Sequence, residues 1–278
     1  MGRGRLEARP APRAGRKGAA MAGADMGRAG LMMPAGVGIG WAGADGAVPG
    51  WVWSGGAGSS GAGTMVEAAA PVLHGYRYSV YAWIARLVLR EKGVAHGWRE
   101  IDPFLPDVPD HYRALHPFGR VPVLVDGDFV LYETCAIARY VDEAFAGPAL
   151  QPEGARARAR MQQIVSVADS YAYRPLVRQV FGHGVFRPRV GRLGDEAEVS
   201  AGLAAAATVL DALDRLVSVP DAAGWTPTLA DLHLAPMLGY FAAAPEGQMM
   251  LARLPRLAAW FAAMAARDAY RETEPALP

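Results

Sequence analysis

The chain has 278 residues, of which 52% are hydrophobic, and this is enough to build two domains without help from disulfide bonds. The single cysteine, Cys135, excludes an intramolecular disulfide and any zinc site made of several cysteines, and we expect no metal. The formal net charge of +1 gives no reason to expect a nucleic-acid partner.

The N-terminal stretch differs in composition from the rest of the chain. Residues 1–64 hold 18 of the 33 glycines and show no helical or strand period. Such a segment buries too little apolar surface to offset its loss of conformational entropy, so residues 1–66 are predicted to be a disordered, low-complexity extension. A signal peptide or a targeting arm is the alternative, although glycines and prolines interrupt the apolar run. We expect no membrane association and a cytoplasmic location.

Alternating strand and helix patterns predict an α/β domain over residues 67–148. The apolar run at 71–74 predicts a buried strand, and apolar residues at helical spacing then predict a helix that ends near Gly93. Residues 95–101 predict a second strand, which completes a βαβ unit. A short helix is expected over residues 110–115.

A β-hairpin and a third helix complete this domain. Residues 121–125 and 129–132 predict two strands that are joined by an Asp-Gly turn. A helix is expected from Thr134 to Phe145, because apolar side chains recur on one of its faces. The predicted order is therefore β-α-β-α-β-β-α.

Only helical patterns remain after this domain, and they predict an all-helical domain over residues 152–272. Helices are expected at roughly 153–181, 196–218, 228–243 and 255–267. Thr228 and Asp231 have the spacing of a capping box at the start of one of these helices. Replacing Asp231 with alanine is expected to lower stability by about 1 kcal/mol, as a fault of folding and not of chemistry.

Three motifs occur in an order and at separations that are typical of one protein family. They are residues 78–93, residues 116–124 (HPFGRVPVL) with residues 131–140 (LYETCAIARY) behind them, and residues 228–236 (TLADLHLAP). On these motifs, residues 70–270 resemble the glutathione S-transferases, and in particular the cytosolic, serine-type bacterial members. The resemblance implies a thioredoxin-like N-terminal domain that binds glutathione and an all-α helical bundle as the C-terminal domain.

The resemblance places the glutathione site at Arg120, Val121, Pro122, Glu133 and Thr134. A cis bond before Pro122 would turn the Val121 backbone toward the cysteinyl part of glutathione; a trans proline at a strand's first residue is the alternative. Glu133 would bind the α-ammonium group, and Thr134 the γ-glutamyl carboxylate at a helix N-terminus. Alternatively, Thr134 only caps the helix. Arg120 would bind the glycyl carboxylate or be a solvated charge.

Conjugation requires glutathione as a thiolate, and a hydroxyl group that is directed at the sulfur stabilises this anion. Ser79 is the favoured catalytic residue, because it lies where serine-type members keep their hydroxyl, and Tyr78 is the alternative; Tyr76 and Tyr81 are nearby. Ser79 would also serve as an ordinary helix N-cap. Cys135 falls inside the third predicted helix and is expected to be a packed hydrophobe.

The second substrate is expected between the domains, in an apolar cleft that is lined by Tyr171, Tyr173, Arg174 and Tyr240. In the alternative, the tyrosines pack in the core and the arginines are solvated. The implied function is detoxification by conjugating glutathione, a co-substrate, to a small hydrophobic electrophile, in a homodimer and without a cofactor. A non-catalytic binding or scaffold protein of the same fold is the competing hypothesis.

Overall fold

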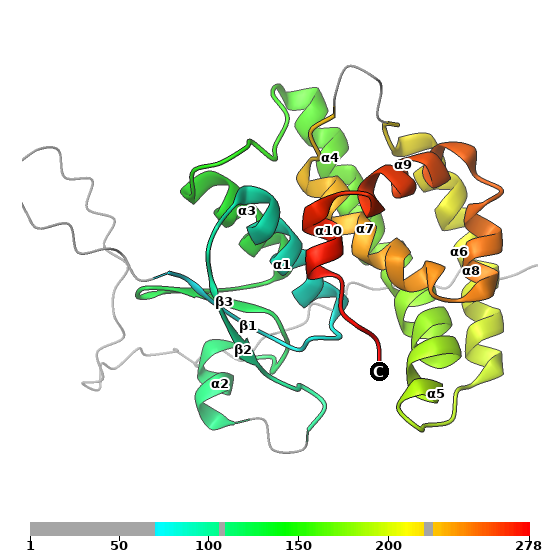
Figure 1. The fold of residues 1–278 in the computed structure, drawn as a ribbon, viewed down its shortest axis with the longest axis horizontal. Helices are drawn as coiled ribbons and strands as arrows, with labels where there is room; N and C mark the ends of the chain where they lie inside the picture. The colour runs from blue at the N-terminus through cyan, green and yellow to red at the C-terminus, as the bar shows by residue number, and fades with distance from the viewer. Residues whose placement is uncertain (1–69, 106–108, 220–224) are drawn as a thin grey trace, which may run out of the picture. The chain divides into compact units, whose positions relative to one another are not determined.

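The structure is a computed structural model that describes residues 70–105, 109–219 and 225–278. The extension expected over residues 1–66 lies outside these residues. The N-terminal domain consists of β1 (Val72–Gly75), α1 (Val80–Lys92), β2 (Gly97–Glu100), α2 (Asp110–Leu115), β3 (Val123–Asp126), β4 (Phe129–Tyr132) and α3 (Thr134–Ala144) (Figure 1). The predicted order of strands and helices in this domain is confirmed.

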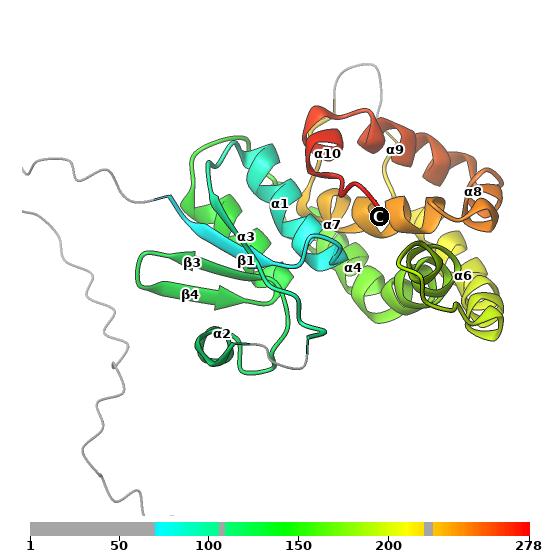
Figure 2. The ribbon, with the colours of Figure 1, turned by 60° about the horizontal axis from the view of Figure 1, so that its bottom comes forward.

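The four strands form one mixed sheet in the order β2-β1-β3-β4. β1 and β2 are parallel, as the βαβ unit requires, whereas β3 runs antiparallel to both β1 and β4. The hairpin turns at Gly127, whose φ of 61° suits a residue without a side chain. Figure 2 shows α1 and α3 on one side of the sheet and α2 on the other.

The C-terminal domain is helical throughout its described elements. These are α4 (Ala155–Val167), η1 (Ala168–Phe186), α5 (Arg187–Arg189), α6 (Glu196–Leu216), α7 (Leu229–Ala242), α8 (Pro245–Leu251), α9 (Pro255–Ala265) and α10 (Asp268–Thr273). The four expected helices are present, and α8 and α10 are additional short ones. None of the described helices has the length and apolar character needed to cross a bilayer.

One helix differs from its predicted course. α4 does not end near residue 181 but continues through the π-helical η1 and α5 to residue 189. α6 packs directly against η1. A side chain at Gly202 of α6 would place its Cβ 2.8 Å from the Cβ of Gln179, so only glycine allows this approach.

α7 forms the centre of the helical domain. Almost every residue of α7 is buried, so the helix is apolar on all sides instead of on one face. It packs against η1, α4 and α9 and also against α1 of the first domain. Thr228 and Asp231 form the predicted capping box at its start.

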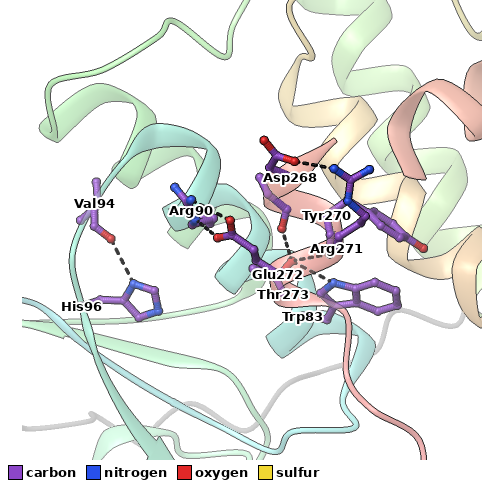
Figure 3. Close-up of polar contacts among 10 residues, drawn as sticks. Trp83, Arg90, Val94, His96, Asp268, Tyr270, Arg271, Glu272 and Thr273 are labelled. Atoms are coloured by element: carbon purple, nitrogen blue, oxygen red, sulfur yellow. Dashed lines mark hydrogen bonds and ion pairs between the residues drawn. The ribbon is translucent and has the colours of Figure 1, made fainter. Parts of the chain in front are cut away.

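The end of the chain packs on α1. The indole Nε1 of Trp83 donates a hydrogen bond of 3.2 Å to the Thr273 hydroxyl of α10, and both side chains are buried (Figure 3). At the surface, Arg90 of α1 forms an ion pair with Glu272. α1 is therefore held by the sheet and α3 on one side and by the helical domain on the other.

Candidate functional site

The segments expected to bind glutathione meet at one end of the sheet. The strand register places three residues of neighbouring strands in one row: His74 of β1, Val123 of β3 and Tyr132 of β4. The loop that carries Ser79 follows β1, the Val121-Pro122 pair precedes β3, and the Glu133-Thr134 pair follows β4. Because β3 is antiparallel to both neighbours, all three segments emerge from the same end of the sheet.

The peptide bond between Val121 and Pro122 is cis, which confirms the prediction. No turn, loop or cap hydrogen bond among the described residues uses the N–H or the C=O of Val121. The loop before it is anchored from α2, where the hydroxyl of the buried Tyr112 donates a hydrogen bond of 2.6 Å to the Arg120 carbonyl. The Arg120 side chain itself is exposed. The anchor leaves both the Arg120 guanidinium and the Val121 backbone available to a ligand.

α3 begins with an unusual backbone conformation at Glu133. Its φ of 71° makes it the one non-glycine residue with a positive φ in the described part of the chain, a state that costs about 1–3 kcal/mol. Glu133 occupies the N-cap position, so the alternative in which Thr134 caps the helix is wrong. The exposed carboxylate of Glu133 makes no capping bond.

The first turn of α3 offers unused donors. The first hydrogen bond within the helix runs from the Ile137 N–H to the Glu133 carbonyl at 2.9 Å, so the preceding N–H groups have no partner inside the helix. The first turn contains no acidic side chain that would offset its partial positive charge. Thr134 is buried at this end. This arrangement suits a carboxylate.

Ser79 is the N-cap of α1. Its Oγ accepts a hydrogen bond of 3.3 Å from the Ala82 N–H, so the N-cap interpretation is confirmed. This role uses the oxygen as an acceptor and leaves the hydroxyl proton free to be donated. The first turn of α1 also lacks acidic residues, so its positive end favours an anion near Ser79. Capping and anion stabilisation are therefore compatible.

Two tyrosines of the loop that carries Ser79 belong to a group of aromatic rings in contact with one another. Ring centroids of Tyr76 and Tyr78 lie 5.4 Å apart, Tyr76 lies 5.9 Å from Phe104, and Tyr78 lies 5.3 Å from Phe186. Phe104 follows β2 and is 67% exposed, whereas Phe186 ends η1. Phe104 and Phe186 could not be predicted from the sequence, because no local pattern connects residues so distant along the chain.

The residues predicted to bind the second substrate do not share one surface. Tyr240 is buried and stacks on Phe181 at 4.0 Å, and its hydroxyl donates a hydrogen bond of 3.0 Å to the Tyr78 carbonyl. Burial raises the pKa of Tyr240, which keeps this donor protonated. Tyr240 thus supports the Ser79 loop from beneath. Tyr171 and Arg174 are exposed on η1. The alternative interpretation, in which the arginines are solvated and the tyrosines pack in the core, therefore holds for Arg174 but not for Tyr171.

The fourth of these residues, Tyr173, packs against Tyr81 with 4.9 Å between ring centroids. Tyr81 lies beside Asp169, and burial together with this carboxylate raises the pKa of its hydroxyl. A phenol that resists ionisation and packs under η1 is poorly placed to act at the Ser79 loop. Tyr81 is therefore the weakest of the hydroxyl candidates.

Cys135 is half-buried and packs against the apolar core, as expected, and its thiol also has a polar partner. Its Sγ donates a hydrogen bond of 3.3 Å to Asp169 of η1, and Asp169 also contacts His233 of α7 at 2.8 Å. Burial, assisted by the Asp169 carboxylate, raises the pKa of Cys135 to about 12. The thiol is protonated at neutral pH, which does not suit a nucleophilic cysteine.

Comparison with known proteins agrees with this geometry. Residues 73–149 match the family model of the glutathione S-transferase N-terminal domain, and residues 196–263 match that of the C-terminal domain. The chain is 34% identical to glutathione S-transferase 3 of Zea mays over 61% of its own length and 77% of the relative's. It is 31% identical to glutathione S-transferase F10 of Arabidopsis thaliana, over 68% and 89% respectively.

Solved structures show the same likeness. The apo form of glutathione S-transferase III is 33% identical, has a TM-score of 0.64, and matches over 76% of this chain and 98% of its own. A theta-class glutathione S-transferase of Xanthomonas axonopodis pv. citri, solved with glutathione bound, is 30% identical with a TM-score of 0.61, over 74% and 98%. The two curated relatives are plant proteins and give no support to a bacterial grouping. By both its domains and its relatives, the chain belongs to the glutathione S-transferase family.

Proposed function

We propose that this protein conjugates the thiolate of glutathione to a small hydrophobic electrophile, with Ser79 as the residue that activates the thiol. One observation carries the proposal: the register of β1, β3 and β4 directs Ser79, Val121 and Thr134 to the same end of the sheet, each with unused hydrogen-bonding capacity. A scaffold protein has no need for all three.

The two ends of glutathione fit different parts of this site. The α3 N-terminus and the Thr134 hydroxyl would bind the γ-glutamyl carboxylate, and the exposed Glu133 carboxylate would pair with the adjacent ammonium group. The Val121 backbone would pair with the cysteinyl unit in the manner of an added strand. The exposed Arg120 guanidinium would reach the glycyl carboxylate.

The Ser79 hydroxyl would donate its proton as a hydrogen bond to the sulfur without losing it. A hydrogen bond to a charged group contributes about 1.5–3 kcal/mol, and each pKa unit corresponds to about 1.4 kcal/mol. Ser79 therefore lowers the thiol pKa from about 8.5 by about 1–2 units, which gives an appreciable thiolate fraction at neutral pH. The sulfur then forms a bond to the electrophilic carbon, whose leaving group departs or whose neighbouring atom takes a proton.

The aromatic group formed by Tyr76, Tyr78, Phe104 and Phe186 is the proposed site of the electrophile. Tyr78 precedes Ser79 in the chain, the other rings are joined to Tyr78 directly or through Tyr76, and Phe104 presents an exposed face. Aromatic rings stack on flat, apolar ligands, so we favour electrophiles that contain an aromatic ring. This group takes the place of the residues expected from the sequence.

The test is the ultraviolet absorbance of the bound thiolate as a function of pH, measured for the wild type, Ser79→Ala, Ser79→Thr and Tyr78→Phe. Ser79→Ala is expected to raise the pKa of bound glutathione by about 1–2 units, and the variants Ser79→Thr and Tyr78→Phe by much less. A rise confined to Tyr78→Phe would make Tyr78 the donor. All four are expected to be retained on immobilised glutathione. A folded wild type that is not retained would refute the enzyme and support the scaffold.

Family membership also supports a homodimer that acts in the cytoplasm in detoxification. Sedimentation velocity of the full chain tests the first part: a single species of twice the chain mass supports it, and a monomer at micromolar concentration contradicts it.

A further inference from the structure

A compact polar cluster of Cys135, Asp169 and His233 lies where α3, η1 and α7 meet. The Cys135 Sγ lies 3.3 Å from one oxygen of Asp169, and the His233 Nε2 lies 2.8 Å from the other. All three potential ligand atoms lie within 4.8 Å of one another. The proposed conjugation reaction uses none of these side chains.

We propose that this cluster binds a divalent cation of the Zn²⁺ class through the Cys135 sulfur, an Asp169 oxygen and the His233 Nε2. Thiolate, imidazole and carboxylate are the three ligand types that Zn²⁺ takes in proteins. A soft sulfur ligand disfavours Mg²⁺ and Ca²⁺, which prefer oxygen ligands. Three protein ligands leave the fourth tetrahedral position to water.

The distances between the side chains are close to those that a tetrahedral site requires. Bonds of about 2.3 Å to sulfur and about 2.0–2.1 Å to oxygen and nitrogen place neighbouring ligand atoms about 3.3–3.6 Å apart. The 3.3 Å between the Cys135 Sγ and the Asp169 Oδ2 is already in this range, whereas the His233 Nε2 lies 2.8 Å from the other oxygen, Oδ1. Binding through a single Asp169 oxygen therefore requires a rotation of the carboxylate or of the His233 side chain. Each ligand comes from a different helix, and packing fixes the helices relative to one another.

Charge and access also suit a cation. Binding replaces the thiol proton of Cys135, and the resulting thiolate and the Asp169 carboxylate together balance a charge of +2. In the described part of the chain, no lysine or arginine forms an ion pair with Asp169. The His233 side chain is only 2% exposed, but that of Asp169 is 33% exposed and provides a route from solvent.

The test is a titration of the full-length, untagged and metal-stripped protein with Co²⁺, a spectroscopic substitute for Zn²⁺. We expect one Co²⁺ per chain, with a sulfur-to-cobalt charge-transfer band in the near ultraviolet that Zn²⁺ abolishes by displacement. The Cys135→Ala variant is expected to lose the charge-transfer band. In calorimetry, both Cys135→Ala and Asp169→Asn are expected to weaken Zn²⁺ binding by more than about tenfold. His111→Ala is the matched control, because this exposed histidine lies on α2, and it should bind as the wild type does.

Either of two results would overturn the proposal: a wild type without the charge-transfer band, or a Cys135→Ala variant with unchanged Zn²⁺ affinity. The three side chains would then form a hydrogen-bonded network, and any bound metal would be an adventitious ion only. The wild-type spectrum decides the question without any variant, and circular dichroism checks that each variant is folded. Glutathione, which itself binds Zn²⁺, is absent from the titration. The outcome is therefore independent of the proposed transferase activity.

Discussion

Replacing Asp231 with alanine removes one side chain that accepts hydrogen bonds from two helices. Its Oδ2 accepts from the Thr228 N–H and from the Thr228 hydroxyl, each at 2.7 Å. Its Oδ1 accepts at 2.7 Å from the indole Nε1 of Trp260 in α9, which is completely buried. Asp231 therefore does more than cap α7: it also joins α7 to α9.

The magnitude follows from the partners that lose their acceptor. Loss of a helix cap costs about 1 kcal/mol. A buried N–H without a partner costs a further 1–3 kcal/mol or so, and water cannot reach the Trp260 indole. Together these effects predict that Asp231→Ala lowers the free energy of unfolding by about 2–4 kcal/mol. This exceeds the loss expected from the capping motif alone.

Urea denaturation, followed by far-ultraviolet circular dichroism, measures this loss. A double-mutant cycle with Trp260→Phe separates its two parts, because phenylalanine keeps most of the ring but has no N–H. Trp260→Phe should be less destabilising in the Asp231→Ala background than in the wild type, with a coupling energy of at least about 1 kcal/mol. Retention on immobilised glutathione should be unchanged while the variant is folded.

Two results would refute this reasoning. Additive effects in the cycle would mean that the bond between Asp231 and the Trp260 indole contributes nothing to stability. A loss of no more than about 1 kcal/mol for Asp231→Ala would reduce the residue to a simple cap.

The remaining predictions concern α1 and α7. Lys92→Met should lower the free energy of unfolding by about 3–5 kcal/mol in urea denaturation, because it leaves Asp142 without its partner in an ion pair whose side chains are only 4% and 6% exposed. Burial alone would raise the pKa of Asp142, but hydrogen bonds, first that from Lys92, hold this pKa below its ordinary value of 3.8. The ion pair therefore contributes fully to stability above about pH 3.8, and this contribution is lost as the pH falls through the lower pKa of Asp142 in the folded protein. The free energy of unfolding should thus depend less steeply on pH in this range in Lys92→Met than in the wild type. An unchanged dependence on pH would contradict the argument. Gly239→Ala places a Cβ 2.2 Å from the Tyr270 hydroxyl and should lower the melting temperature, with a loss of about 1–3 kcal/mol. Tyr270→Phe in the same chain should restore part of it, and no recovery would exclude this clash as the cause.

Features that depend on neighbours along the chain could be predicted from the sequence. The β3–β4 hairpin follows from an Asp-Gly turn between apolar runs, and the start of α3 at Thr134 follows from the helical period behind it. The family resemblance also predicted that Ser79, Val121 and Thr134 lie close together. The strand register explains it physically.

Features that depend on distant partners could not be predicted. Nothing near Tyr240 indicates that its hydroxyl bonds to the carbonyl of Tyr78, which lies 162 residues away. The contact between Cys135 and Asp169 likewise spans 34 residues and two helices. The positive φ of Glu133 is hidden as well, because sequence patterns lead one to expect such a backbone only at glycine or asparagine.

The bond between Trp83 and Thr273 has a consequence for how this protein can be divided. It joins residues 190 positions apart, and it connects the helix that Ser79 caps to the last helix of the chain. The thioredoxin-like half produced by itself would expose the Trp83 ring and leave α1 without its outer cover. We therefore expect the two halves recognised by separate family models to unfold as one cooperative unit, because the final helix completes the packing of a helix near the start of the first domain.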